Sequence, residues 1–315
     1  MPLLGMVDDV FIISESGYKT QRLNGFINAK TAAKRLQFGA KKCQVMHVGK
    51  HIPKHKKTDL YVDGWLMDET DNKNTNIKDA EEKFNGEEEI IQTDNTKYLG
   101  QIISNDGTNT KNIENRAQKG IGLVNKIGTT LTNTPGGKYH FELAVLMRNA
   151  ILISSILSCS EIWYNISEWE YRKLEQTDEM LMKEILKCSS QIQLEVLYLE
   201  LGLMPIRFII LLRRVMYLQH ILKQQKEQTL LYRFFKAQMN NPTKNDWVTC
   251  VIQDLEKIDM NLELIEIENM SEGKFKQVCK EKIRKLAFAY LIAKLNSRNN
   301  SNPVQYTHLE MAQYL

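Results

Sequence analysis

The hydrophobic pattern of the chain changes at about residue 111, and this change limits the possible folds. Before it, apolar residues come in short runs of strand length, the last of which ends at the turn residues Asn105-Asp106-Gly107. After it, apolar residues recur at helical spacing, as over 112–129. The sequence therefore predicts an α+β protein, with a sheet-containing part over 1–111 and an all-helical part over 112–315.

The composition is that of a globular chain, with 43% hydrophobic and 25% charged residues among 315. The net charge of +4 is mild, but residues 1–67 carry 11 Lys or Arg against 5 Asp or Glu. A basic surface of this kind suits a phosphate backbone, and an ordinary solvated face is the alternative. Residues 68–94 are acidic instead, with ten Asp or Glu against three Lys, and predict a solvent-exposed insertion.

Two adjacent carboxylates, Asp8 and Asp9, stand between the apolar runs 3–7 and 10–13. The runs predict an antiparallel hairpin with both acids at its tip. Mg²⁺ is usually bound by one or two carboxylates together with substrate phosphates, so the pair is a candidate metal site for nucleotidyl transfer with two metal ions. A plain turn without any ligand is the alternative.

Two further motifs follow the hairpin. The stretch from Lys41 to Gly49 reads KKCQVMHVG and has Lys42 at the start of a predicted strand. The stretch from Lys97 to Ile103 reads KYLGQII and lies in a strand predicted over 97–104. In this order the three motifs resemble the later palm motifs of reverse transcriptases, above all those of non-LTR (LINE-type) retrotransposons. The resemblance covers mainly the first 130 residues.

The resemblance implies a role for each motif. Asp8 would be a direct metal ligand and Asp9 a weaker ligand or a field-shaping partner. Lys42 would lie near the leaving pyrophosphate as a candidate general acid. Three residues would lie near the primer end: Tyr98, Leu99 and Gly100. The implied cofactor is Mg²⁺, and the implied partners are an RNA template, a DNA primer and dNTP.

The resemblance also implies the architecture and has two departures. The implied fold is the C-terminal part of a polymerase palm, an antiparallel sheet with a helix, followed by a helical thumb and further helices. Met6 stands where the family usually has an aromatic residue. The family places a further metal-binding aspartate upstream, whereas only seven residues precede Asp8 here. We therefore expect that this chain alone does not polymerise. A non-catalytic nucleic-acid-binding remnant and a helical scaffold with a vestigial palm are the alternatives.

Two helical segments carry candidate nucleic-acid contacts. The first, 112–129, would open the thumb, and its Arg116 and Lys119 are candidates for sequence-independent backbone contacts. The second, 206–223, carries several cationic and aromatic residues, for which a salt-bridged face is the alternative: Arg207, Arg213, Arg214, Tyr217 and His220.

Metal modules and membrane spans find little support in the sequence. Cys43, His47, His51 and His55 recur every four residues, but Gly49 and Pro53 interrupt any helix there, and no zinc-type paired spacing is present. The most apolar long segment, 141–164, contains Glu142, Arg148, Asn149 and Glu161 and predicts a buried core helix, so no membrane partner is expected. Five scattered cysteines predict free thiols in a reducing, intracellular compartment, nucleus or cytoplasm.

Overall fold

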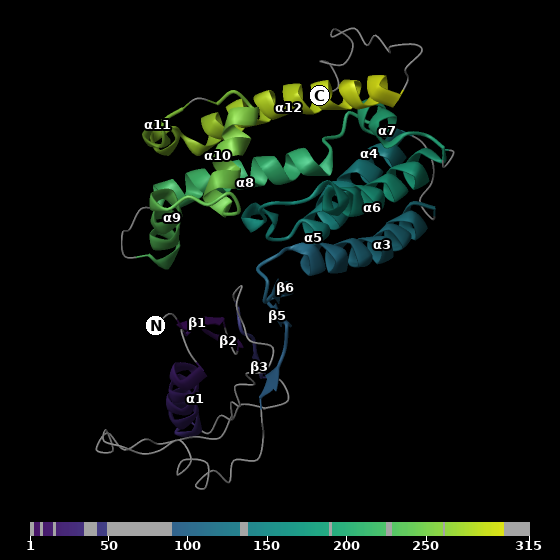
Figure 1. Ribbon diagram of the computed structural model, residues 1–315. Coiled ribbons are helices and arrows are strands. Elements are labelled where there is room, and N and C mark those ends of the chain that lie inside the picture. The colour runs from purple at the N-terminus through teal and green to yellow at the C-terminus, as the bar shows by residue number, and fades with distance from the viewer. Residues whose placement is uncertain are drawn as a thin grey trace, which may run out of the picture. The chain divides into compact units, whose positions relative to one another are not determined.

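The structure is a computed structural model, shown in Figure 1. It describes residues 3–6, 9–14, 17–34, 43–48, 90–132, 138–188, 191–224, 229–260 and 262–298. The chain divides into two compact units, Met1–Thr108 and Asn109–Leu315, each considered by itself below. This division falls close to the boundary drawn from the sequence at residue 111. Strands occur in the first unit and long helices dominate the second, so the α+β class is confirmed.

The first unit contains one helix and three two-stranded ladders among its described residues. The helix is α1 (Gly17–Ala32). The antiparallel ladders join β1 (Leu3–Met6) to β2 (Asp9–Ile12) and β5 (Asn95–Tyr98) to β6 (Gln101–Ser104). The third ladder joins β3 (Gln44–Val45) to β4 (Ile91–Gln92) and is parallel, which departs from the purely antiparallel sheet expected from the sequence.

The first hairpin is present but differs in one detail from the expectation. Asp9 is the first residue of β2, where it pairs with Met6, and is therefore a strand residue. The expected strand over 97–104 is wrong, because the chain reverses at Leu99 and Gly100. Both residues have positive φ, 46° and 79°, as the two-residue turn of a type I′ hairpin requires.

The second unit is a stack of long helices. The helices are α3 (Thr110–Thr132), α6 (Glu168–Leu186), α8 (Ile206–Lys223) and α12 (Glu272–Arg298). In this stack α3 packs on α6, α6 on α8, and α8 on α12 (Figure 1). The close approach of α3 to α6 depends on Gly120, since a Cβ there would lie 2.5 Å from Cγ2 of Thr177.

Shorter helices complete the second unit. They are α4 (Lys138–Met147), the π-helix η2 (Arg148–Ile153), α5 (Ser154–Ile156), the 3₁₀ helix η3 (Ser160–Ile162), α7 (Leu194–Glu200), α9 (Leu230–Asn240), α10 (Trp247–Lys257) and α11 (Leu264–Asn269). The single core helix expected over 141–164 is therefore wrong. It changes to π geometry at Arg148, and the chain leaves the helix before Cys159, whose φ of 58° is left-handed. None of the described helices is both long and apolar enough to cross a membrane.

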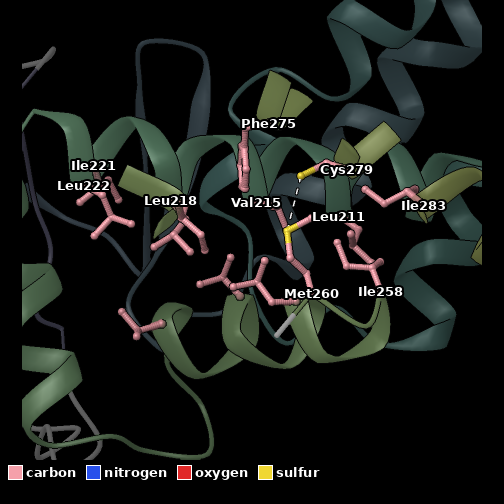
Figure 2. Close-up of a cluster of buried hydrophobic side chains, with 14 of the residues drawn as sticks. Leu211, Val215, Leu218, Ile221, Leu222, Ile258, Met260, Phe275, Cys279 and Ile283 are labelled. Atoms are coloured by element: carbon pink, nitrogen blue, oxygen red, sulfur yellow. Dashed lines mark hydrogen bonds between the residues drawn. The ribbon is translucent and has the colours of Figure 1, made fainter. Parts of the chain in front are cut away.

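The largest core of the second unit lies between α8 and α12. Figure 2 shows apolar side chains from α8 facing Phe275 and Cys279 of α12, with Met260 beside them. The side chains drawn from α8 lie at helical spacing: Leu211, Val215, Leu218, Ile221 and Leu222. α8 also places Ile206 and Ile210 in a second core, around α3 and α6, so its apolar residues face two sides and it lies inside the stack.

Candidate functional site

The first and third sequence motifs meet through two aromatic rings. Phe11 lies in β2, two residues after Asp9, and its ring centroid is 5.2 Å from that of Tyr98 at the end of β5. The rings are tilted by 39°, and both side chains are half-buried. An aromatic pair of this kind contributes about 0.5–1.5 kcal/mol beyond the area it buries. The contact therefore fixes the β1–β2 hairpin against the β5–β6 hairpin.

The second motif reaches the same hairpin through β3. Thr93 donates its backbone N–H to the carbonyl oxygen of Val45 at 2.9 Å. The Thr96 hydroxyl donates to Oε1 of Gln44 at 2.8 Å. These two bonds tie the strand that follows Lys42 to the β4–β5 segment. The described parts of all three motifs thus lie around β5 within the first unit.

Leu99 and Gly100 form the tip of the β5–β6 hairpin. The Leu99 side chain is 50% exposed, although it is large and apolar. A residue other than glycine held at positive φ costs about 1–3 kcal/mol, and such strain collects at ligand-contacting sites. Leu99 is therefore a candidate contact point at the tip of this hairpin.

The catalytic part of the sequence prediction lies largely outside the described residues. Asp8, Lys42 and the side chain of Asp9 are not among them, so the metal site stays a prediction. Within the described parts of the chain, no three His, Cys, Asp or Glu side chains gather into a group suited to a metal ion. Cys43 is described, and burial raises the pKa of its thiol, which keeps the thiol protonated and a poor metal ligand.

The two candidate cations on α3 differ sharply. Arg116 was expected to contact phosphate, but it is only 8% exposed and donates from Nη1 to the carbonyl oxygen of Ser155 at 3.0 Å. It lies next to Ala117, on the face that α3 buries, and in this position it serves the packing of the helix. Lys119 lies on the exposed face, together with Lys111 and Lys126.

Two of the three arginines on α8 are held in ion pairs, which confirms the salt-bridged alternative for them. Arg207 donates to both oxygens of Glu175 at 2.8 and 3.1 Å. Arg214 lies 2.6 Å from the carboxylate of Asp254, and both side chains are buried. Burial would lower the pKa of each guanidinium, but these carboxylates outweigh it and raise the pKa instead.

Arg213 is the exception on α8. Its Nη1 donates to two uncharged oxygens, the carbonyl of Leu157 and the hydroxyl of Ser160. Desolvation lowers the pKa of this guanidinium, and the charge of Glu161 offsets only part of the effect. Arg213 therefore keeps a positive charge that no ion pair among the described residues balances.

A buried polar cluster was not predicted from the sequence. Arg148 donates to both oxygens of Asp178 at 2.7 and 2.5 Å, and the Tyr198 hydroxyl donates to Asp178 at 3.0 Å. Burial raises the pKa of the Tyr198 hydroxyl well above its usual value, so it stays a donor. A cavity of about 210 Å³ lies beside this cluster, with Arg284 in its lining. Arg148 stands in an apolar segment, which indicates that it has a buried partner. The sequence alone does not say that this partner is Asp178.

Comparison of the chain with protein-family models, with curated proteins and with solved structures finds no match.

Proposed function

We propose that the first unit carries part of the active site of an RNA-directed DNA polymerase of the non-LTR retrotransposon type. The observation that carries this proposal is the ring contact between Phe11 and Tyr98. Because of it, the strand that begins at Asp9 lies beside the hairpin that ends in Leu99-Gly100. A polymerase of this type needs its metal-binding acids beside the segment that contacts the primer, and this contact supports the proposal.

The residues have the chemistry for nucleotidyl transfer. In that reaction the primer 3′ oxygen forms a bond to the α-phosphorus of a dNTP, and the bond from that phosphorus to the β-phosphate oxygen breaks. Asp8 and Asp9 supply the carboxylate oxygens that Mg²⁺ prefers. Bound Mg²⁺ would lower the pKa of the attacking hydroxyl and neutralise charge on the leaving pyrophosphate. Lys42 would give a proton to that pyrophosphate, and the exposed Leu99 would contact the primer.

The second unit offers a surface for the duplex. The exposed face of α3 carries three lysines against one acid, Glu114: Lys111, Lys119 and Lys126. Lysines spaced along one face of a helix can contact successive phosphates without reading the sequence. We assign this face to the backbone of an RNA–DNA hybrid, as a thumb helix would use it, and we leave Arg116 out because it is buried.

The proposal is tested by the binding of a labelled RNA–DNA hybrid with a recessed primer end, measured by fluorescence anisotropy. Binding is compared in Mg²⁺ with the matching dNTP and in EDTA. We expect Mg²⁺ and dNTP to tighten binding by the wild-type chain, and the double variant Asp8→Asn/Asp9→Asn to lose this tightening. The matched control is Asp68→Asn/Glu69→Gln, which removes an adjacent acid pair from the acidic segment and should behave as wild type.

A non-catalytic nucleic-acid binder is the second candidate, and the exposed lysines of α3 favour it equally. It predicts binding of the same hybrid with no difference between the Asp8→Asn/Asp9→Asn variant and wild type under either condition. That result would reject the polymerase-type site while it keeps the nucleic-acid surface. A complete lack of hybrid binding at moderate salt would reject both.

A further inference from the structure

Basic residues greatly outnumber acidic ones between residues 201 and 245. This stretch has one acidic residue, Glu227, against eight basic ones: Arg207, Arg213, Arg214, Lys223, Lys226, Arg233, Lys236 and Lys244. Carboxylates from other helices neutralise two of them, since Arg207 pairs with Glu175 and Arg214 pairs with Asp254. Most of the other basic residues lie on α8, on α9 or just after α9.

We call this surface the basic end and define it by five cations: Arg213, Lys223, Arg233, Lys236 and Lys244. In the part of the chain that the structure describes, none of the five takes part in an ion pair. Arg213 is half-buried and the other four are exposed. Lys223 ends α8, Arg233 and Lys236 lie on α9, and α9 packs against both α8 and α10.

Aromatic side chains lie among these cations. Phe234 is 54% exposed, while the adjacent Phe235 takes the buried position of α9 in the core. On α8, the ring of Tyr217 stacks on that of His220, with centroids 5.8 Å apart and an angle of 16°. His220 is the exposed member of this pair. An exposed phenylalanine and an exposed, already stacked imidazole offer flat faces to a ligand.

Further contacts hold Tyr217, which stacks on His220, and Tyr232 of α9. Trp247 packs edge-on against Tyr217 at 5.8 Å and donates its indole N–H to the carbonyl oxygen of Glu161 at 2.7 Å. On α9, the Lys236 ammonium lies 5.3 Å from the centroid of the Tyr232 ring. These contacts order the side chains before any ligand arrives, so less conformational entropy is lost on binding.

We propose that the basic end binds single-stranded nucleic acid. Arg233, Lys236 and Lys223 contact successive phosphates, and bases stack on Phe234 and on His220. Proteins that hold single strands without sequence preference combine these same two elements, a basic track and aromatic platforms. This inference stands apart from the proposed polymerase-type site, which lies in the first unit, and from the face of α3, which is assigned to a duplex.

A membrane surface is the rival partner for a basic amphipathic helix. The composition of α9 argues against it, because only Leu231 and Phe234 are large apolar side chains exposed on that helix. Helices that lie in the membrane interface bury a whole apolar face, whereas Phe235 of α9 is already buried in the protein core and Tyr232 and Met239 pack against that core. The charge and the flat rings are better matched to phosphates and bases.

The electrostatic part is tested with a fluorescent single-stranded RNA of mixed sequence and the full chain, by anisotropy over a range of salt concentrations. Each phosphate contact contributes about 0.7 to the slope of log K against log salt for a single strand. The variant Arg233→Gln/Lys236→Gln should therefore lower the slope by about 1.4. The control is Lys274→Gln/Lys276→Gln, which removes two exposed cations from the first turns of α12 and should leave the slope unchanged.

The stacking part is tested at position 234 with two variants of different chemistry. Phe234→Leu keeps an apolar side chain but loses the flat ring, and it should weaken binding about fivefold or more. Phe234→Tyr keeps the ring and should bind as wild type. We expect both variants to keep the wild-type circular dichroism spectrum, because Phe234 is exposed and lies outside the core.

Three outcomes would overturn the inference. The first is a chain that does not bind the single strand at moderate salt. The second is a failed variant test: the Arg233→Gln/Lys236→Gln variant and its control weaken single-strand binding equally, or Phe234→Leu binds the single strand as tightly as wild type. The third is binding to vesicles that contain phosphatidylserine, lost in Arg233→Gln/Lys236→Gln, without binding to the RNA; this would assign the surface to a membrane. If Mg²⁺ and dNTP fail to tighten hybrid binding while single-strand binding is intact, the polymerase-type site is rejected and this inference stands.

Discussion

Phe11 and Tyr98 lie far apart in the sequence, yet their rings are in contact at 5.2 Å between centroids. Phe11 extends the strand that begins at the acidic motif, and Tyr98 begins the Tyr-Leu-Gly motif. The contact therefore brings described parts of two motifs together within the first unit. It also predicts that the two side chains contribute together to the free energy of unfolding.

The Phe11–Tyr98 contact predicts a coupling between the two side chains. We expect the double-mutant cycle of Phe11→Leu and Tyr98→Leu to give a coupling of about 0.5–1.5 kcal/mol in the free energy of unfolding. Urea unfolding followed by circular dichroism checks this value. The control pair is Phe11→Leu with Tyr232→Leu, since Tyr232 belongs to the second unit; additive effects in the first cycle would contradict the contact.

Two glycines of α3 predict opposite effects of the same substitution. Gly120→Ala places a methyl group 2.5 Å from Cγ2 of Thr177 and should destabilise the chain by about 1–3 kcal/mol. Gly122→Ala meets no atom within 4 Å and should stabilise it by about 1 kcal/mol, because alanine favours the helix. Thermal unfolding of both variants measures the difference, and equal effects would contradict the packing of α3 on α6.

The buried pair of Arg214 and Asp254 predicts a large loss of stability when one partner is removed. Asp254→Asn leaves the guanidinium without its charged partner at a position where both side chains are buried, and should cost about 3–5 kcal/mol. Glu281→Gln breaks the exposed pair with Lys285, which water screens, and should leave the free energy of unfolding almost unchanged. Urea unfolding curves compare the two, and a similar small cost for both would contradict the burial.

Cys279 predicts a pH-dependent contribution to stability. Burial raises the pKa of this thiol to about 12, whereas an unfolded cysteine titrates near about 8.5. The folded chain therefore holds this proton more tightly than the unfolded chain. The resulting gain in the free energy of unfolding is complete below about pH 8.5 and is lost as the pH rises toward about 12.

The burial of Cys279 also predicts slow alkylation. At a mildly alkaline pH, iodoacetamide should label half-buried Cys188 long before Cys279, as judged by mass spectrometry of tryptic peptides. Equal labelling rates in the folded chain would contradict the burial shown in Figure 2.

Local chemistry determines several helix ends, and these can be read from the sequence. The capping box at the start of α6 is present, with Ser167 accepting from the backbone of Glu170 and Glu170 accepting from the backbone of Ser167. α7 is followed by Gly202 with a φ of 58°, and Pro205 immediately precedes α8. Each of these signals involves residues within one turn of a helix end, so a reader of the sequence has all the information needed.

The sequence failed where distant residues decide the structure. The apolar run that contains Leu99 looks continuous, and the pairing of β5 with β6 is what makes it a turn. The apolar run over 141–164 also looks continuous, but the chain leaves the helix before Cys159, and Trp163 is 1% exposed in the core around α3 and α6. Arg116 looked like a surface cation until its partner, the carbonyl of Ser155, was known.

The most direct test of the central proposal replaces Mg²⁺ by Fe²⁺ and adds ascorbate, so that a bound metal cleaves the nearby backbone. With hybrid and dNTP present, we expect cleavage beside Asp8-Asp9 and at the Leu99-Gly100 turn, because the Phe11–Tyr98 contact holds these segments together. Excess Mg²⁺ and the Asp8→Asn/Asp9→Asn variant should both suppress these products. Cleavage confined to other segments, or unchanged by the variant, would contradict a polymerase-type metal site in this chain.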